Sequence, residues 1–263
     1  MRKIFRLAGI LAAGAAVVSL TACSGASDAT QNLTSNSAAT EATENNDANF
    51  NVGKTEGSKY ANDFFGISFN APEEWRLLNE EQLGLINNNI KDVLTADEAK
   101  TAIENGKTSV IMYAVSKDSK QNASLTVEKH EINNTQDVDL DSFLDKAITS
   151  LKNNLPGQGF SDLSVEKATV SFCGADTPAL KIKGKYGAEG KDIRDIYETQ
   201  IYMFNGSYSG CITTSSFDED KSGDILQSFS KSESPAESQT TEAETAPVTA
   251  ADTTTAETTQ NAS

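Results

Sequence analysis

The 263-residue chain is poor in the residues that build common active sites, with one histidine, three cysteines and one tryptophan. Because His130 is the sole histidine, there is no pair for a histidine-rich zinc site, and a Ser-His-Asp relay would have to pass through it. None of the patterns Gly-x-Ser-x-Gly, Ser-x-x-Lys or a phosphate-binding glycine loop stands at an expected strand-to-helix junction. We therefore expect no catalytic residues, no metal ion and no cofactor.

Basic residues are also scarce. The chain has 22 Lys and Arg against 38 Asp and Glu, which gives a formal net charge of −16 at pH 7. Such an acidic chain is poorly suited to bind the phosphates of nucleic acid or an anionic lipid surface. We expect no nucleic-acid partner.

The most apolar stretch of the sequence lies at its start. Arg2, Lys3 and Arg6 precede an apolar run over residues 7–20, followed by small residues up to Cys23. A basic start, an apolar centre of about 7–15 residues and small residues before a cut are the parts of an export signal. The run is shorter than the roughly 20 residues that span a hydrocarbon core. Residues 1–22 are therefore predicted to be a removed signal peptide.

The end of that segment, Leu20-Thr21-Ala22-Cys23 followed by Ser24 and Gly25, resembles the lipobox of bacterial lipoproteins. The resemblance implies that Cys23 becomes the first residue and carries a diacylglyceryl group, with fatty chains such as palmitate. Each buried methylene contributes about 0.8 kcal/mol, so two or more chains anchor stably. We expect a lipid-anchored protein on the extracytoplasmic face of the cell membrane.

Two further segments have a composition that disfavours packing. Residues 23–57 are mainly Ser, Thr, Asn, Ala, Gly and acids, and residues 231–263 are mainly Thr, Ala, Glu and Ser. Segments that bury so little apolar surface do not offset the entropy of ordering. The first is predicted to be a disordered linker behind the lipidated Cys23, and the second a disordered tail. A glycosylated stalk or a partner-binding tail is the alternative for the second.

Residues 58–230 are predicted to form one α/β domain. It opens with a Tyr-x-Asn at Tyr60 and Asn62, a Gly-aliphatic-x-aromatic strand at Gly66, Ile67 and Phe69, and a Pro-x-x-Trp at Pro72 and Trp75. This opening resembles that of PsbP-like domains, which often begin with the same three features. The resemblance implies an α-β-α sandwich and a role as an accessory or assembly subunit.

The periodicity of the domain predicts an α+β fold, an antiparallel sheet with helices packed on both faces. Helical spacing covers residues 79–106, with a break at the capping-box pattern that starts at Thr95, and residues 140–154 and 218–230. Alternating polar and apolar residues indicate strands. Asn205-Gly206 predicts a hairpin turn that places Cys211 opposite Gln200. The expected strands are 67–69, 108–116, 124–132, 164–172, 177–185, 194–204 and 207–214.

Three polar features have plain structural explanations. His130 falls with Thr126 and Glu128 on the polar side of its strand, which predicts a solvated surface histidine. The run Asp137-x-Asp139-x-Asp141 resembles the start of a calcium loop, but Ser142 and Ile148 stand where that loop needs Gly and Glu, so a helix cap is preferred. Asp218 and its acidic neighbours are assigned to a helix start.

A basic stripe follows one predicted strand. Lys181, Lys183 and Lys185 alternate with apolar residues, a pattern typical of a protected edge strand. The functional alternative is that these lysines form a binding site for an anionic ligand or a lipid headgroup.

The remaining cysteines, Cys173 and Cys211, could share one side of the sheet. An exported protein allows a disulfide between them, and two free thiols are the alternative. If the domain has a ligand groove, we expect it beside Trp75, Phe65 and Tyr60, where the first strand meets Pro72.

These patterns favour a membrane-anchored extracytoplasmic lipoprotein with a non-catalytic binding or protein-interaction domain. Its partners would be the membrane, through the anchor, and an unidentified envelope protein or small ligand. A cell-envelope enzyme with a carboxylate-based site is one alternative. A solute-capturing subunit for transport is another.

Overall fold

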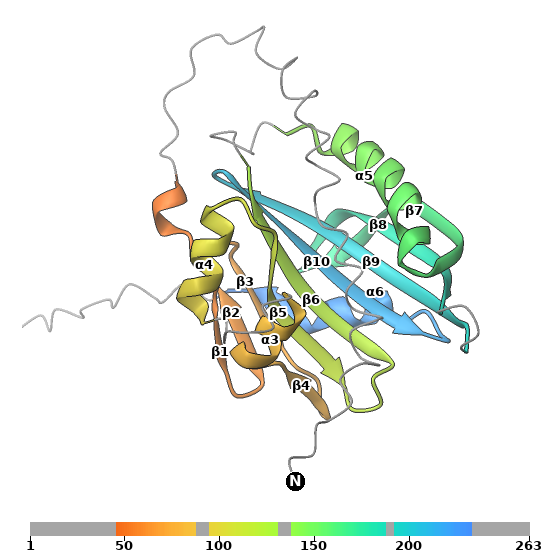
Figure 1. Ribbon diagram of the computed structural model, residues 1–263, viewed down its shortest axis with the longest axis horizontal. Coiled ribbons are helices and arrows are strands. Elements are labelled where there is room, and N and C mark those ends of the chain that lie inside the picture. The colour runs from red at the N-terminus through yellow and green to blue at the C-terminus, as the bar shows by residue number, and fades with distance from the viewer. Residues whose placement is uncertain (1–45, 88–94, 131–137, 188–191, 233–263) are drawn as a thin grey trace, which may run out of the picture. The chain divides into compact units, whose positions relative to one another are not determined.

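The computed structural model describes residues 46–87, 95–130, 138–187 and 192–232, and these form two antiparallel sheets with helices (Figure 1). The large sheet has the order β4-β5-β6-β10-β9-β8-β7, and the small sheet has the order β1-β2-β3-β11. The strands are β1 (Lys54–Glu56), β2 (Lys59–Asn62), β3 (Ile67–Asn70), β4 (Trp75–Leu77), β5 (Ser109–Ser116), β6 (Gln121–Lys129), β7 (Phe160–Phe172), β8 (Ala175–Tyr186), β9 (Arg194–Asn205), β10 (Tyr208–Phe217) and β11 (Phe229–Lys231). The predicted α+β class with an antiparallel sheet is confirmed.

Helices border both faces of the large sheet. The α-helices are α3 (Glu80–Ile86), α4 (Ala96–Glu104), α5 (Leu140–Asn154) and α6 (Ser222–Ile225), and the 3-10 helices are η4 (Asn46–Asn49), η6 (Leu155–Gln158) and η7 (Leu226–Ser228). In Figure 1, α3 and α4 lie beside β5 and α5 lies beside β7 and β8. The predicted arrangement, with helices alone on both faces of one sheet, is changed in one respect: the small sheet also covers part of one face of the large sheet.

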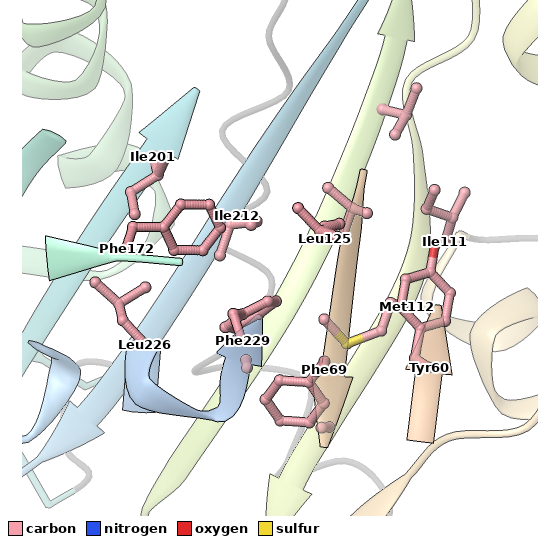
Figure 2. Close-up of a cluster of buried hydrophobic side chains, with 14 of the residues drawn as sticks. Tyr60, Phe69, Ile111, Met112, Leu125, Phe172, Ile201, Ile212, Leu226 and Phe229 are labelled. Atoms are coloured by element: carbon pink, nitrogen blue, oxygen red, sulfur yellow. The ribbon is translucent and has the colours of Figure 1, made fainter. Parts of the chain in front are cut away.

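The largest core lies between the two sheets. Figure 2 shows side chains of the small sheet, such as Tyr60 and Phe69, on the same cluster as Leu125 and Ile212 of the large sheet. Phe229 of β11 packs against Phe69 with ring centroids 4.8 Å apart. Because strand side chains alternate between faces, these apolar residues leave the other face of β6 and β10 to their neighbours in sequence.

Two of the predicted helix starts, those at Thr95 and Asp139, have the expected caps. The side-chain oxygen of Thr95 accepts the Glu98 N–H at 3.2 Å, and the Glu98 carboxylate accepts the Thr95 N–H at 2.7 Å. Asp139 accepts the Asp141 N–H at 3.2 Å at the start of α5. The cap assigned to Asp139 from the sequence is therefore confirmed, as is the break at Thr95.

The folded region begins before the predicted boundary at residue 58. Phe50, assigned to the linker, is 2 % exposed and stacks on Tyr208 with ring centroids 4.0 Å apart. The Asp47 carboxylate accepts the Ser207 N–H and hydroxyl, each at 2.7 Å. Composition did not predict this order, because it comes from contacts that Asp47 and Phe50 make with residues far away in the sequence.

The helix predicted over residues 218–230 is wrong in its extent. Only residues 222–228 are helical, and Phe229 is extended because it pairs with Phe69 in the small sheet. The buried hydroxyl of Thr214 donates to the Ser222 carbonyl at 2.7 Å, which stabilises the start of α6. Asp218 does not start a helix. It accepts hydrogen bonds from Arg194, which together with Lys120 lower its pKa to about 2.

Two predictions about strands also need correction. The hairpin at Asn205-Gly206 forms, but Asn205 pairs with Tyr208, so Cys211 lies opposite Tyr202 and not Gln200. The turn is displaced by one residue because Asn205 remains in the ladder and its amide donates to the Phe64 carbonyl at 2.6 Å.

The strand with the three lysines is not an edge. It is β8, which is paired on both sides by β7 and β9. Lys181 and Lys185 form ion pairs with Asp220 at 3.7 Å and Asp162 at 3.2 Å.

Candidate functional site

A strip of polar side chains runs along one face of the large sheet, on β6, β10 and β9. It consists of alternate residues of β6, alternate residues of β10 and two residues of β9. All nine are at most 6 % exposed. We call this set the polar track: Asn122, Ser124, Thr126, Glu198, Gln200, Ser209, Cys211, Thr213 and Ser215.

The strand register places these side chains in rows across the three strands. Ser215 pairs with Asn122 on one side and with Glu198 on the other, and the same order repeats two residues further on at Thr213. Directly paired residues point to the same face, with neighbouring strands about 4.8 Å apart. Ser215 therefore lies between Asn122 and Glu198.

Apolar residues border the track on both sides. Near β5, residues of α3 and the chain before it pack on the strand, and the members of this cluster are Leu78, Leu83, Ile86, Val110, Tyr113 and Val115. Toward β7, the buried residues of α5 pack on β8, and the members include Leu144, Ala147, Leu151, Leu180 and Ile182. The polar strip thus lies between two apolar clusters on the same face, and its member Cys211 also packs in the cluster toward β7.

Glu198 is the most deeply placed carboxyl group of the track, at 1 % exposure. Its Oε1 accepts a hydrogen bond from Ser215 Oγ at 3.1 Å. Burial raises the pKa of Glu198 to about 8, so the group is mainly protonated at neutral pH. Burial, and then the nearby Glu198, also raise the pKa of Tyr113, while burial is the main cause that raises the pKa of Cys211 to about 12.

Three buried oxygen atoms on this face have no hydrogen-bond partner among the described residues. They are Asn122 Oδ1, Glu198 Oε2 and Glu128 Oε2. Leaving a buried polar group unpaired costs about 1–3 kcal/mol, and folded proteins rarely keep several such groups without a reason. All three are oxygens of an amide or a carboxyl group. Asn122 Oδ1 can accept a hydrogen bond from a bound molecule, and the carboxyl oxygens can do so in the ionised form, which Glu198 reaches once it loses its proton.

The far end of the track holds the sole histidine. His130 Nε2 lies 2.7 Å from Ser209 Oγ, and burial lowers the pKa of His130. Glu128 precedes it on the same face and pairs with Ser209. The sequence predicted a solvated surface histidine, but the residue is half-buried because its ring packs down onto β10.

The residues expected to line a ligand groove lie in the core between the sheets. Tyr60 is 1 % exposed, and its hydroxyl donates to the Val52 carbonyl at 2.8 Å. Phe65 packs on Gly210, where an added Cβ would lie 3.2 Å from the ring. Trp75 packs against the same cluster from β4. Their packing roles are clear, and a groove beside Trp75 stays a prediction.

Cys173 and Cys211 are both free thiols in the structure, so the disulfide considered from the sequence is not formed. The reason is their placement: Cys173 packs at the edge of the core between the sheets, whereas Cys211 belongs to the cluster under α5. Cys23 lies outside the described residues, as does most of the predicted tail.

Within residues 46–87, 95–130, 138–187 and 192–232, no group of histidine, cysteine and acidic side chains has the arrangement of a metal site. Over the same ranges, no helix combines the length and apolar character needed to cross a bilayer.

No family model and no curated protein matches this chain. Fifteen chains of solved structures match it, among them the following two. LpqN of Mycobacterium tuberculosis, described as involved in cell envelope biogenesis, is 15 % identical, with a TM-score of 0.34 over 66 % of this chain and 80 % of that one. The PsbP of the cyanobacterium Synechocystis sp. PCC 6803 is 13 % identical, with a TM-score of 0.37 over 66 % and 91 %. At these values the likenesses carry no inference about ligand or activity.

Proposed function

We propose that this chain is a lipid-anchored extracytoplasmic protein whose domain binds a small polar ligand on the polar track without transforming it. The observation that carries the binding role is the set of buried, unpartnered oxygens on one sheet face. The anchor rests on the sequence, where a basic start and an apolar run lead to Leu20-Thr21-Ala22-Cys23.

The chemistry of the track favours binding over catalysis. Its members are mostly hydroxyl and amide groups, which orient a ligand through hydrogen bonds. The one buried carboxyl group, Glu198, has no second titratable carboxyl in its row, where Ser215 and Asn122 are its neighbours. Paired carboxyl groups with different pKa values are the usual basis of acid and base catalysis.

The anchor is tested by metabolic labelling with a palmitate analogue in cells that produce the chain. We expect the wild type and Ser24→Ala to be labelled and to sediment with membranes, and Cys23→Ala to be unlabelled. Labelling that persists in Cys23→Ala would refute the anchor.

The binding role is tested by the melting temperature of the full-length chain carrying Cys23→Ser, which keeps it unlipidated. A ligand that binds only the folded state raises this temperature. We expect a small polar compound in a broad panel of sugars, amines and amino acids to raise it, and Glu198→Gln to reduce the shift. No shift with any compound would count against the binding role.

The His130–Ser209 pair favours a second candidate, an acyl-transfer enzyme with Ser209 as nucleophile, because the 2.7 Å separation suits a base and a nucleophile. Ser209 lies within a strand and is 0 % exposed, which makes attack on a substrate sterically poor. A fluorophosphonate probe tests it. Labelling of the wild type that disappears in Ser209→Ala would establish the enzyme and displace the binding proposal.

A further inference from the structure

The three unpartnered oxygens of this sheet face, two in the polar track and one in Glu128 at its end, share one chemical property that the binding role leaves unexplained. Asn122 Oδ1 is an amide acceptor, and Glu128 Oε2 and Glu198 Oε2 belong to carboxyl groups. Asn122 and Glu198 are 3 % and 1 % exposed, so an unpaired oxygen on either side chain is costly in the unliganded protein. The group that matches a surplus of acceptors is one that carries several donors and no acceptor.

We propose that the polar track, together with Glu128 at its end, binds a linear polyamine-like cation, with one ammonium group at Glu198 and another at Glu128. This inference rests on the proposed binding function and names its ligand class. A primary ammonium has three N–H donors and no acceptor, so it satisfies carboxyl and amide oxygens without leaving a lone pair of its own unpaired.

Charge supports a cation over a neutral polyol. The track contains no lysine or arginine, and the ion pairs of the described residues engage other carboxylates, such as Asp218 with Arg194 and Asp220 with Lys181. The unliganded Glu198 avoids the cost of a buried charge by staying protonated, and an ammonium in contact with it would stabilise its ionised form. The net charge of −16 also attracts cations to the protein.

The spacing of the two carboxyl groups supports a long ligand. Glu198 lies in the row of Ser215, and Glu128 lies opposite Ser209, six residues away on β10. Six residues correspond to about 20 Å along an antiparallel strand, and two strand spacings add about 10 Å across it. A single compact amine cannot reach both ends. A flexible chain with amines at both ends can, and the hydroxyl groups between them can accept hydrogen bonds from its internal amines.

The test is titration calorimetry of spermine into the full-length chain carrying Cys23→Ser, at pH 7 and 0.15 M salt. The variants are Glu198→Gln and Glu128→Gln, which keep the shape of the side chain and remove its charge. Glu81→Gln is the matched control, because Glu81 is exposed on α3 and loses the same charge. We expect saturable 1:1 binding that each track variant weakens at least tenfold and the control leaves within twofold.

A second readout separates a contact at Glu198 from a general effect of charge. Because the unliganded Glu198 is mainly protonated at pH 7, ammonium binding should release close to one proton, measured from the dependence of the heat on the buffer. Tyr113, Tyr186 and Cys211 face Glu198 from β5, β8 and β10, and all have raised pKa values, so they stay protonated. The charged side chains of α3 and α5 are exposed. Glu198→Gln should abolish the release.

Four results would overturn the inference: no saturable binding of spermine, equal affinity in Glu198→Gln and Glu81→Gln, no loss in Glu128→Gln, or binding of butylamine as tight as that of spermine. A shift in melting temperature with a neutral sugar, lost in Glu198→Gln, would reject the polyamine and leave the binding function in place. The palmitate labelling of Cys23 is independent of either outcome.

Discussion

The buried Glu198 should make the stability of this protein fall as pH rises. Its pKa is about 8 in the folded protein and about 4.5 when exposed in the unfolded chain. Below pH 4.5 both states hold the proton and the group imposes no penalty. Between pH 4.5 and 8 the unfolded state loses the proton first, so the stability present at low pH is lost as pH rises through the folded value.

The magnitude follows from the difference between the two pKa values. A difference of roughly 3.5 pH units, at about 1.4 kcal/mol per unit, amounts to about 5 kcal/mol above pH 8. Domains of this size have a free energy of unfolding of about 5–15 kcal/mol, so the effect is measurable. Glu198→Gln keeps an acceptor for the hydroxyl of Ser215 and has no proton to lose, so it should remove this component of the pH dependence.

The assay is urea unfolding of the chain carrying Cys23→Ser at pH 5, 6, 7 and 8, followed by the fluorescence of Trp75, the sole tryptophan. The difference in free energy of unfolding between Glu198→Gln and its parent should grow by about 1 kcal/mol per pH unit in favour of the variant. Taking the difference cancels the titration of His130 and Glu128, which both proteins share. Glu81→Gln should run parallel to the parent. Parallel profiles for Glu198→Gln would refute the assigned burial and its effect on pKa.

Three further predictions concern the fold. Ile103→Ala should lower the free energy of unfolding by about 2–5 kcal/mol, because Ile103 is 0 % exposed. The control Leu85→Ala, at 41 % exposure, should change it by less than about 1 kcal/mol, and equal urea midpoints for the two variants would contradict the packing of α4. Asp47→Ala should cost about 1–3 kcal/mol by the same assay, since its carboxylate pairs with the hairpin before β10, and an unchanged midpoint would leave residues 46–50 outside the domain. In native protein with Cys23→Ser, a thiol reagent should modify Cys173 well before Cys211, and slow, equal modification of both would contradict their different burial.

Local signals in the sequence predicted much of the secondary structure. The capping box at Thr95, the cap at Asp139, the apolar stripe over residues 140–154 and the alternation on the strands all appear in the structure. These features depend on hydrogen bonds and side chains within a few residues of each other. The predictions that failed depend on distant partners: the final helix ends early because Phe229 pairs with Phe69, and the lysine strand is internal because β7 completes the sheet beyond it.

The polar track also combines a feature that local sequence predicts with one that depends on distant residues. The sequence placed Thr126, Glu128 and His130 together on one side of a strand, and alternation alone suffices for that. It assigned this side to solvent, because a strand with one polar face normally meets water. Only the tertiary structure aligned the polar faces of β6, β10 and β9 and buried Glu198 among them.

The sequence by itself determined the acidic character and the α+β class, because composition and short-range periodicity are properties of contiguous residues. The export and lipidation signal at Cys23 is also read from contiguous residues and stays a prediction. Strand order, the second sheet and the burial of Glu198 were decided by tertiary structure, because each joins residues far apart in the chain. Glu198 and Asn122 are 76 positions apart and become neighbours of one serine only through the pairing of β9 and β6 with β10.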